Sequence, residues 1–494
     1  MHVSVVQSFG HKYHLSQNFV GREQSALDTG HSSHTSLFAF SQSYGTNRPD
    51  LPPQRDRHYS PAVTLQKPVS DGAFQPRPRD LRLYLGVRFS SALGTQIQSV
   101  AVGWQVYDMT HDPMALGYVG LCSFLPMVLL VLPAGDLADR IDRRWMLMAS
   151  YVVQIAASAG LLLLTLAGVK AMWAYYSVIT LLGVALGLSQ PAMQSFLPFL
   201  VSLERLPQAI AWNASAYRVA VIGGPALGGF LYDLGPVVNY SLCLALYIFT
   251  FAAMAILRIR PQQRRTHQGS THERIADGIN YIRRQPILLG AISLDLFAMF
   301  LGGTTALLPI FARDILHTGP AGLGFLRTAP AMGAALVALV LARRQLRRHV
   351  GIAMFCCVAI FGAATLAFGL SRNFALSMTA LVVSGSADMI SVYVRSALVQ
   401  LATPDDMRGR IGSVNSLFVG ASNEFGEFRA GMSAGLFGTV PAVVIGGLGT
   451  LTVVGLWMML FPALRRVDRF SDVEVKSDLP PGSAIRPALA APAE

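Results

Sequence analysis

Long apolar stretches alternate with short polar ones along most of the chain, and this pattern predicts helices that cross a membrane. Each stretch reaches the roughly 20 residues that a helix needs to span the hydrocarbon core of a bilayer. The predicted spans cover residues 81–107, 114–134, 145–166, 172–199, a fifth from about 208, 237–257, 287–311, 323–341, 351–370, 374–398, 411–437 and 442–461. The pattern therefore predicts an all-α polytopic membrane protein with twelve transmembrane helices.

Composition supports a protein that works in the bilayer. Of 494 residues, 52% are hydrophobic and 13% are charged, whereas soluble domains carry about 25% charged residues. The net charge of +12 comes from arginines in the short loops of one side, which the positive-inside rule assigns to the cytoplasm. Both termini are then cytoplasmic, and the basic charge gives no reason to expect a nucleic-acid partner.

The sequence carries no sign of catalysis. It contains no Walker-type stretch for ATP hydrolysis, no nucleophile–base pair and no cluster with metal-ligand spacing. We therefore expect no enzymatic activity, no metal and no cofactor.

Outside the spans, residues 1–80 are rich in Ser, Gln, His and Pro, which is typical of a disordered cytoplasmic tail. Residues 464–494 read as a second polar cytoplasmic tail.

A charged motif follows the second span. Gly135 is expected to allow a tight turn, and Asp139 precedes an arginine cluster. The motif resembles the loop between the second and third helices of the major facilitator superfamily, Gly-x-Leu-x-Asp-Arg-x-Gly-Arg-Arg. The matching residues are Gly135, Leu137, Asp139, Arg140, Arg143 and Arg144, and the departure is Asp142 in place of Gly. The alternative is a loop that only anchors the topology.

This resemblance implies a particular fold. Major facilitator transporters consist of two pseudo-symmetric six-helix halves. Here the halves would be residues 81–259 and 286–463, joined by a cytoplasmic loop over 260–285 that contains a surface helix. The resemblance also implies that Asp139 contacts the inner end of the eleventh helix when the inner gate is closed.

The fifth predicted span carries a second motif. Gly residues allow helices to pack backbone to backbone, and a proline bends its helix. The sequence Gly-Pro-x-x-Gly-Gly resembles the antiporter motif of drug–proton antiporters, here Gly224, Pro225, Gly228 and Gly229. The alternative is a plain small-residue packing helix.

Polar residues line one face of the first predicted span. Arg88, Ser91, Thr95, Gln98 and Gln105 share that face at helical spacing. Polar side chains in a membrane helix avoid lipid, so this face predicts either the wall of a central cavity or a hydrogen-bonding seam between helices.

Charged residues also lie inside other predicted spans. A charge at the centre of a membrane helix costs roughly 2.5–3.5 kcal/mol on insertion scales, so these groups must pair or line water. They are Arg218, Asp295, Asp388, Arg395, Glu424, Glu427 and Arg429. The acids are candidates for proton coupling, with Asp388 and Glu424 preferred, or for a structural network of salt bridges. Arg218 is a partner for an acid or a ligand for an anionic substrate.

Three stretches resemble one branch of the superfamily, the enterobactin-type siderophore exporters and related drug effluxers. They are residues 103–108, 403–410 and 423–431. The resemblance implies a monomeric, proton-coupled exporter of a small molecule (a siderophore, drug or metabolite) in the bacterial inner membrane, working by alternating access. An importer of the same fold and a transport-dead sensor or scaffold remain the alternatives.

Overall fold

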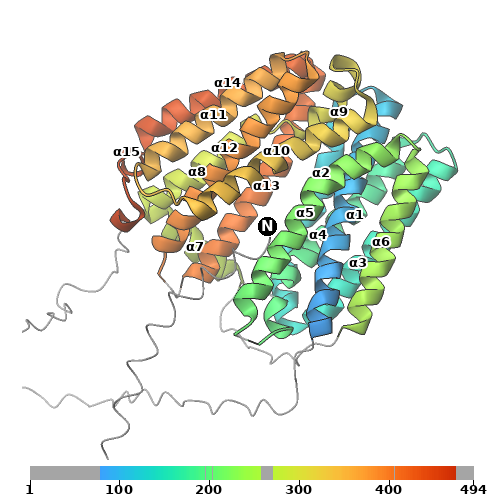
Figure 1. The fold of residues 1–494 in the computed structure, drawn as a ribbon, viewed down its shortest axis with the longest axis horizontal. Coiled ribbons are helices and arrows are strands. Elements are labelled where there is room, and N and C mark those ends of the chain that lie inside the picture. The colour runs from blue at the N-terminus through green and yellow to red at the C-terminus, as the bar shows by residue number, and fades with distance from the viewer. Residues whose placement is uncertain (1–77, 195, 203, 258–270, 405–406, 474–494) are drawn as a thin grey trace, which may run out of the picture. The chain divides into compact units, whose positions relative to one another are not determined.

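The computed structural model describes residues 78–194, 196–202, 204–257, 271–404 and 407–473 (Figure 1). The predicted N-terminal tail up to residue 77 and the residues from 474 onward lie outside this described part. So do residues 258–270, which include the first part of the predicted loop between the halves.

Six long helices form the first half. They are α1 (Pro78–Thr110), α2 (Pro113–Arg140), α3 (Arg143–Leu166), α4 (Met172–Gln194), α5 (Leu206–Tyr232) and α6 (Pro236–Ile256), with a short turn η1 (Leu197–Phe199) before α5. Helix α1 packs against α5 and α6, α2 packs against α4, and α3 packs against both α4 and α6.

The second half repeats this arrangement. Its first span is α8 (Pro286–Gly302), continued by η2 (Thr305–Leu307), α9 (Leu308–Ile310) and η3 (Phe311–Ile315). The others are α10 (Gly319–Arg343), α11 (Val350–Leu370), α12 (Phe374–Leu401), α13 (Arg408–Phe437) and α14 (Thr439–Leu460). Helix α8 packs against α13 and α14, α10 against α12, and α11 against α12 and α14. Because each pairing of the first half recurs, the two halves are pseudo-symmetric, and the predicted fold class is confirmed.

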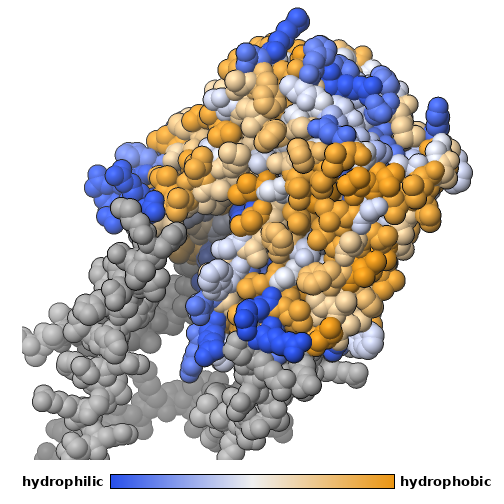
Figure 2. Space-filling view, turned by 45° about the vertical axis from the view of Figure 1, so that its right-hand side comes forward, coloured by the Kyte–Doolittle hydropathy of each residue, from blue (hydrophilic) through white to orange (hydrophobic). Residues whose placement is uncertain are grey.

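The described residues contain twelve long helical spans when α8 and its continuation are taken as one. Nine of these are apolar enough to cross a membrane by composition alone, and the others are α1, α5 and α13. These three helices belong to the faces where the halves meet, where polar and small residues replace part of the apolar surface. Figure 2 shows the hydrophobic side chains as a broad band on the visible face, with hydrophilic residues toward both ends.

The turn expected at Gly135 is absent. Helix α2 continues to Arg140, so most of the predicted loop over residues 135–144 is the last part of that helix. Only Ile141 and Asp142 connect α2 to α3. The Asp142 carboxylate accepts a hydrogen bond from the backbone N–H of Arg144 (2.9 Å) and caps α3. The residue that departs from the family pattern is therefore the one that starts the next helix.

Beyond the spans, two further segments pack on the second half. Helix α7 (Thr271–Arg284) lies in the stretch between the halves and contacts α13 and α8. After α14, the chain continues through α15 (Pro462–Arg465) and η4 (Phe470–Asp472). The backbone N–H of Gly351 bonds to the carbonyl of Val467 (3.0 Å). The first residues of the predicted C-terminal tail are thus folded against the start of α11.

Contacts between the halves concentrate toward one end of the helices, which we call the closed end. There Tyr107 of α1 donates to Asp314 of η3, and Arg313 pairs with Asp108. Helix α2 meets α13 where Gly117 faces Gly431, and α5 meets α10 where Gly229 faces Gly324. The opposite end carries the predicted cytoplasmic loops, including the connection between α2 and α3, and we call it the basic end.

Candidate functional site

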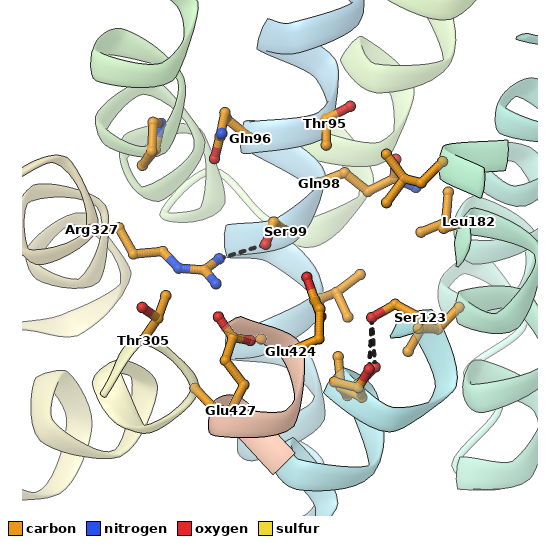
Figure 3. A pocket seen from close by; sticks show the side chains of 18 of the residues that line it. Thr95, Gln96, Gln98, Ser99, Ser123, Leu182, Thr305, Arg327, Glu424 and Glu427 are labelled. Atoms are coloured by element: carbon orange, nitrogen blue, oxygen red, sulfur yellow. Dashed lines mark hydrogen bonds between the residues drawn. The ribbon is translucent and has the colours of Figure 1, made fainter. Parts of the chain in front are cut away.

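A cavity of about 390 Å³ lies between the two halves. Both halves contribute to its wall, with residues of α1 to α6 on one side and residues of α10, α13 and the η2–α9 turns on the other. Its polar lining residues are Thr95, Gln96, Gln98, Ser99, Ser123, Gln154, Tyr247, Thr305, Arg327, Glu424 and Glu427 (Figure 3). Apolar side chains such as Leu116, Ile179 and Leu182 complete the wall. The cavity can therefore hold a small molecule that has both polar and apolar parts.

The second half supplies the charges of this cavity. Arg327 of α10 extends toward α1, where its Nη1 donates to Ser99 Oγ (2.8 Å) (Figure 3). Glu424 and Glu427 come from α13, three residues apart and hence on one face. Arg327 lies within electrostatic range of both. One guanidinium thus shares the cavity with two carboxyl groups.

A glycine on α2 lies against the turn of α13 that carries the acids. A Cβ at Gly120 would lie 3.5 Å from Glu427 Cβ and 3.9 Å from the Glu424 carbonyl oxygen, which are ordinary van der Waals contacts. On the same helix, Phe124 packs edge-on against Phe425, with ring centroids 4.6 Å apart. This contact between the halves lies directly beside the acids.

The polar face of α1 divides between the two roles left open by the sequence. Thr95 and Gln98 line the cavity. Gln98 also donates to Ser158 (3.2 Å) and accepts from Tyr247 (3.0 Å), so it links α1 to α3 and α6. Gln105 is not among the lining residues. It belongs to a hydrogen-bonding seam, which the next paragraph describes.

The seam joins four helices of the first half. Gln105 donates to Thr165 of α3 (3.1 Å) and to Tyr175 of α4 (3.4 Å). It accepts from Tyr240 of α6 (2.6 Å).

Arg88 also lies away from the cavity lining, and its guanidinium stacks over the Tyr217 ring of α5, 4.3 Å from the centroid.

A separate charged cluster lies inside the second half. Arg395 Nη1 of α12 lies 3.2 Å from Asp295 Oδ2 of α8, and both side chains are almost fully buried. Arg395 also donates to Asn415 of α13 (3.3 Å), and Ser391 donates to Asp295 (3.4 Å). Asp388 lies within electrostatic range of this pair. Its Oδ1 is buried and has no hydrogen-bond partner among the described residues.

The two remaining predicted charges differ in their surroundings. Arg429 donates from Nε to the Phe300 carbonyl (2.8 Å) and from Nη2 to the Leu301 carbonyl (2.6 Å). It therefore satisfies the carbonyl end of α8, a favourable place for a cation. Arg218 is exposed on α5 and lies within electrostatic range of Asp388 in the other half.

The glycines of the α5 motif face two different neighbours. A Cβ at Gly224 would lie 2.6 Å from Gln96 Cβ, and one at Gly228 would lie 3.0 Å from Ile97 Cα, both on α1. A Cβ at Gly229 would lie 2.4 Å from the Pro320 carbonyl oxygen and 2.9 Å from Gly324 Cα, both on α10. Pro225 lines the cavity. The motif thus packs α5 within its half and against the other half.

The residues of the α2–α3 motif are only partly described. Arg143 stacks over the Phe199 ring, 5.0 Å from its centroid, and Arg144 donates to the Ala255 carbonyl at the end of α6. Both contacts tie this connection to the first half. Gly135, Asp139 and Arg140 belong to the described backbone of α2, but the surroundings of Gly135 and the side chains of Asp139 and Arg140 are not described.

Sequence reasoning missed Arg327. It stands alone in the apolar helix α10, 16 residues before the basic end of that helix at Arg343. The rule that singled out the other charges inside spans applies to it equally. Ser99 and Gln96 were also missed, since they lie beside the polar face that the spacing had defined.

Comparison with known proteins identifies the family. Residues 81–483 match the model of the family described as transmembrane secretion effector. Enterobactin exporter EntS of Citrobacter koseri is 26% identical over 382 residues, which cover 77% of this chain and 91% of that protein. Enterobactin exporter EntS of Escherichia coli O157:H7 is 25% identical over 380 residues, with the same coverage.

Solved structures share the fold. A POT family transporter in complex with a thioalcohol-conjugated peptide gives a TM-score of 0.64 at 12% identity, covering 79% of this chain and 98% of that one. A bacterial homologue of the iron transporter ferroportin, in an inward-facing state, gives 0.59 at 16% identity, covering 79% and 100%. The chain is thus a multi-pass membrane transporter and not an enzyme, and it belongs to the transmembrane secretion effector family within the major facilitator superfamily.

Proposed function

We propose that this protein is a proton-coupled exporter of a small molecule in the bacterial inner membrane. The observation that carries the proposal is the cavity between the halves, which contains two carboxyl groups and a guanidinium. The contacts between the halves at the closed end support a state in which this cavity communicates with the basic end. With the arginine-rich loops and both termini in the cytoplasm, that state receives substrate from inside the cell.

Glu424 and Glu427 are the proposed proton carriers. Their side chains are half-buried and line one cavity. Ionising both carboxyl groups would place two negative charges close together, so one of them readily holds a proton. Asp388 and Asp295 are less suited to exchange with substrate, because they are not among the described residues that line the cavity. In alternating access, protons taken up from outside would be released inside before the substrate moves outward.

The names of the relatives make a siderophore the first substrate to test. Enterobactin would be added to inverted membrane vesicles with an acidic lumen, and its accumulation and the accompanying loss of lumenal protons would be followed. We expect pH-driven accumulation in the parent protein. Glu424→Gln and Glu427→Gln should still bind substrate but lose at least ten-fold in pH-driven accumulation, a factor that corresponds to about 1.4 kcal/mol. The matched control is Glu204→Gln, because Glu204 is exposed and lies outside the cavity.

The same assay tests direction and gating. Accumulation that requires the opposite proton gradient would mean import, and binding without flux would mean a sensor. Full pH-driven flux in both Glu variants would remove them as carriers. The family resemblance assigns Asp139 a contact with the eleventh helix in the inner gate. Asp139→Asn should then slow transport while expression stays normal, and an unchanged rate would leave that motif as an anchor.

A further inference from the structure

Arg327 has two alternative sets of partners. In the structure it donates across the cavity to Ser99 of the first half (2.8 Å). The carboxyl groups of Glu424 and Glu427, which belong to its own half, lie within electrostatic range. Figure 3 shows the guanidinium aimed at Ser99, with both acids beside it. The first partner joins the halves, whereas the second pair would not.

The charge of the acids decides which partner is favoured. Arg327 is a charged donor in either bond, but a carboxylate also carries the opposite charge, so its bond to the guanidinium is stronger than the bond to a neutral hydroxyl. With both acids protonated, this advantage is lost and the Ser99 hydroxyl becomes the better acceptor. The described lining residues carry only one other ionisable group, Tyr247 of α6, and the lining residues of α1, α2, α3, α4, α5 and the η2–α9 turns are neutral. The acid pair is therefore the main source of charge that Arg327 experiences.

The bond to Ser99 lies next to the contacts that close the cavity. On the following residue of α10, Thr328 Oγ1 donates to the Ile222 carbonyl of α5 (3.0 Å). About one turn nearer the closed end, Gly324 meets Gly229. Arg327 thus ends a continuous row of contacts between α10 and the first half. Its release would remove the hydrogen bond that joins α10 to α1 in the wall of the cavity.

We propose that Arg327 couples the proton occupancy of Glu424 and Glu427 to the contact between the halves. When the acids are protonated, the Arg327–Ser99 bond helps to hold the closed end shut. When a carboxyl group gives its proton to water, the resulting carboxylate draws the guanidinium back to its own half and the bond breaks. No other covalent bond changes. This inference rests on the proposed function, because it takes these acids as the proton carriers.

The test measures opening at the closed end. Lys170, after α3, and Arg372, after α11, are exposed at that end, one in each half. Both would be replaced by cysteine and spin-labelled in full-length protein whose four native cysteines have been replaced. The distance between the labels would be measured in nanodiscs by double electron–electron resonance, from mildly acidic to mildly alkaline pH. We expect the short distance to dominate at acidic pH and to decline as pH rises.

Three variants and one control separate the proposal from a structural role. Ser99→Ala should lower the ratio of closed to open populations at acidic pH by roughly ten-fold or more, the value of one hydrogen bond to a charged group, about 1.5–3 kcal/mol. Arg327→Gln should make the label distance independent of pH, and Arg327→Lys should keep the direction of the pH response. Arg343→Gln, at the exposed end of the same helix, should behave as the parent.

Two results would overturn the inference. One is a parent-like pH response in Arg327→Gln, and the other is a parent-like population ratio in Ser99→Ala. If the parent protein still accumulates enterobactin when the proton gradient drives transport, these results refute only the role of Arg327. A parent that shows no proton-coupled flux refutes the proposed function itself, and with it the inference.

Discussion

The two halves share one pattern of helix packing but bury different chemistry. In the first half, most buried polar groups are amides, hydroxyls and phenols, several of which bond to one another, as in the seam around Gln105, and the exception among the described residues is Asp80 in the first turn of α1. In the second half, the buried polar groups include the ions Asp295 and Arg395, and Arg429 on the end of α8. Neutral networks keep the same charge across the physiological pH range, whereas carboxyl groups can change theirs. Under the proposed function, the second half would therefore sense protons, and the first half would supply neutral partners.

The largest effect should come from breaking the buried ion pair. Asp295→Asn leaves Arg395 as a buried charge with no opposite partner at 3.2 Å. The free energy of unfolding should fall by about 3–5 kcal/mol. Reversible unfolding in mixed micelles containing sodium dodecyl sulfate would measure it.

Asp388→Asn is the matched control for this change. Its Oδ1 already lacks a hydrogen-bond partner among the described residues, so removing the charge should leave stability unchanged or slightly raise it. Equal losses in the two variants would show that Asp388 shares the ion pair. The cluster would then be one network of three charges.

The next effect concerns two adjacent glycines of α5. A methyl group at Gly229 would press on the backbone of α10 in the other half, 2.4 Å from the Pro320 carbonyl oxygen. Gly229→Ala should therefore open the closed end and slow transport several-fold, roughly the effect of a 1 kcal/mol shift between two states. The label distance between positions 170 and 372 would report the opening.

Gly228→Ala adds the same methyl group, but on the side of α5 that faces α1 of its own half. Its methyl group would lie 3.0 Å from Ile97 Cα of α1, a tight backbone contact that requires α1 and α5 to move apart by a few tenths of an ångström. We expect a loss of about 1 kcal/mol in stability and an unchanged label distance. A longer label distance in this variant as well would mean that the packing of α1 against α5 also controls the closed end.

The sequence predicted the fold better than the site. Span lengths and the arginine asymmetry sufficed for twelve helices, because both follow from the bilayer. The turn at Gly135 was mispredicted, since a glycine after an apolar run permits a turn without requiring one, and the helix continues until Asp142 caps the next. Which half each α5 glycine faces depends on helix rotation, which motif spacing leaves open.

The charges show the same limit. Charge inside a span predicted residues that avoid lipid, but it could not separate Glu424, which lines the cavity, from Asp295, which pairs within its half. That distinction depends on which helices are neighbours. Pairing across the bundle, such as Arg327 with Ser99, joins residues 228 positions apart. A single sequence contains no local signal for it.

The smallest effect should come from the neutral seam of the first half. Tyr240→Phe removes the hydroxyl that donates to Gln105 Oε1 at 2.6 Å, and the loss in stability should be about 1 kcal/mol. Tyr176→Phe is a control with a longer bond, 3.4 Å to the Ala115 carbonyl, and should cost less. Because phenols and amides stay neutral at physiological pH, the Tyr240→Phe loss should be the same in mildly acidic and mildly alkaline buffer. Unfolding curves at both pH values would show this, and a loss that depends on pH would mean that the first half also responds to protons.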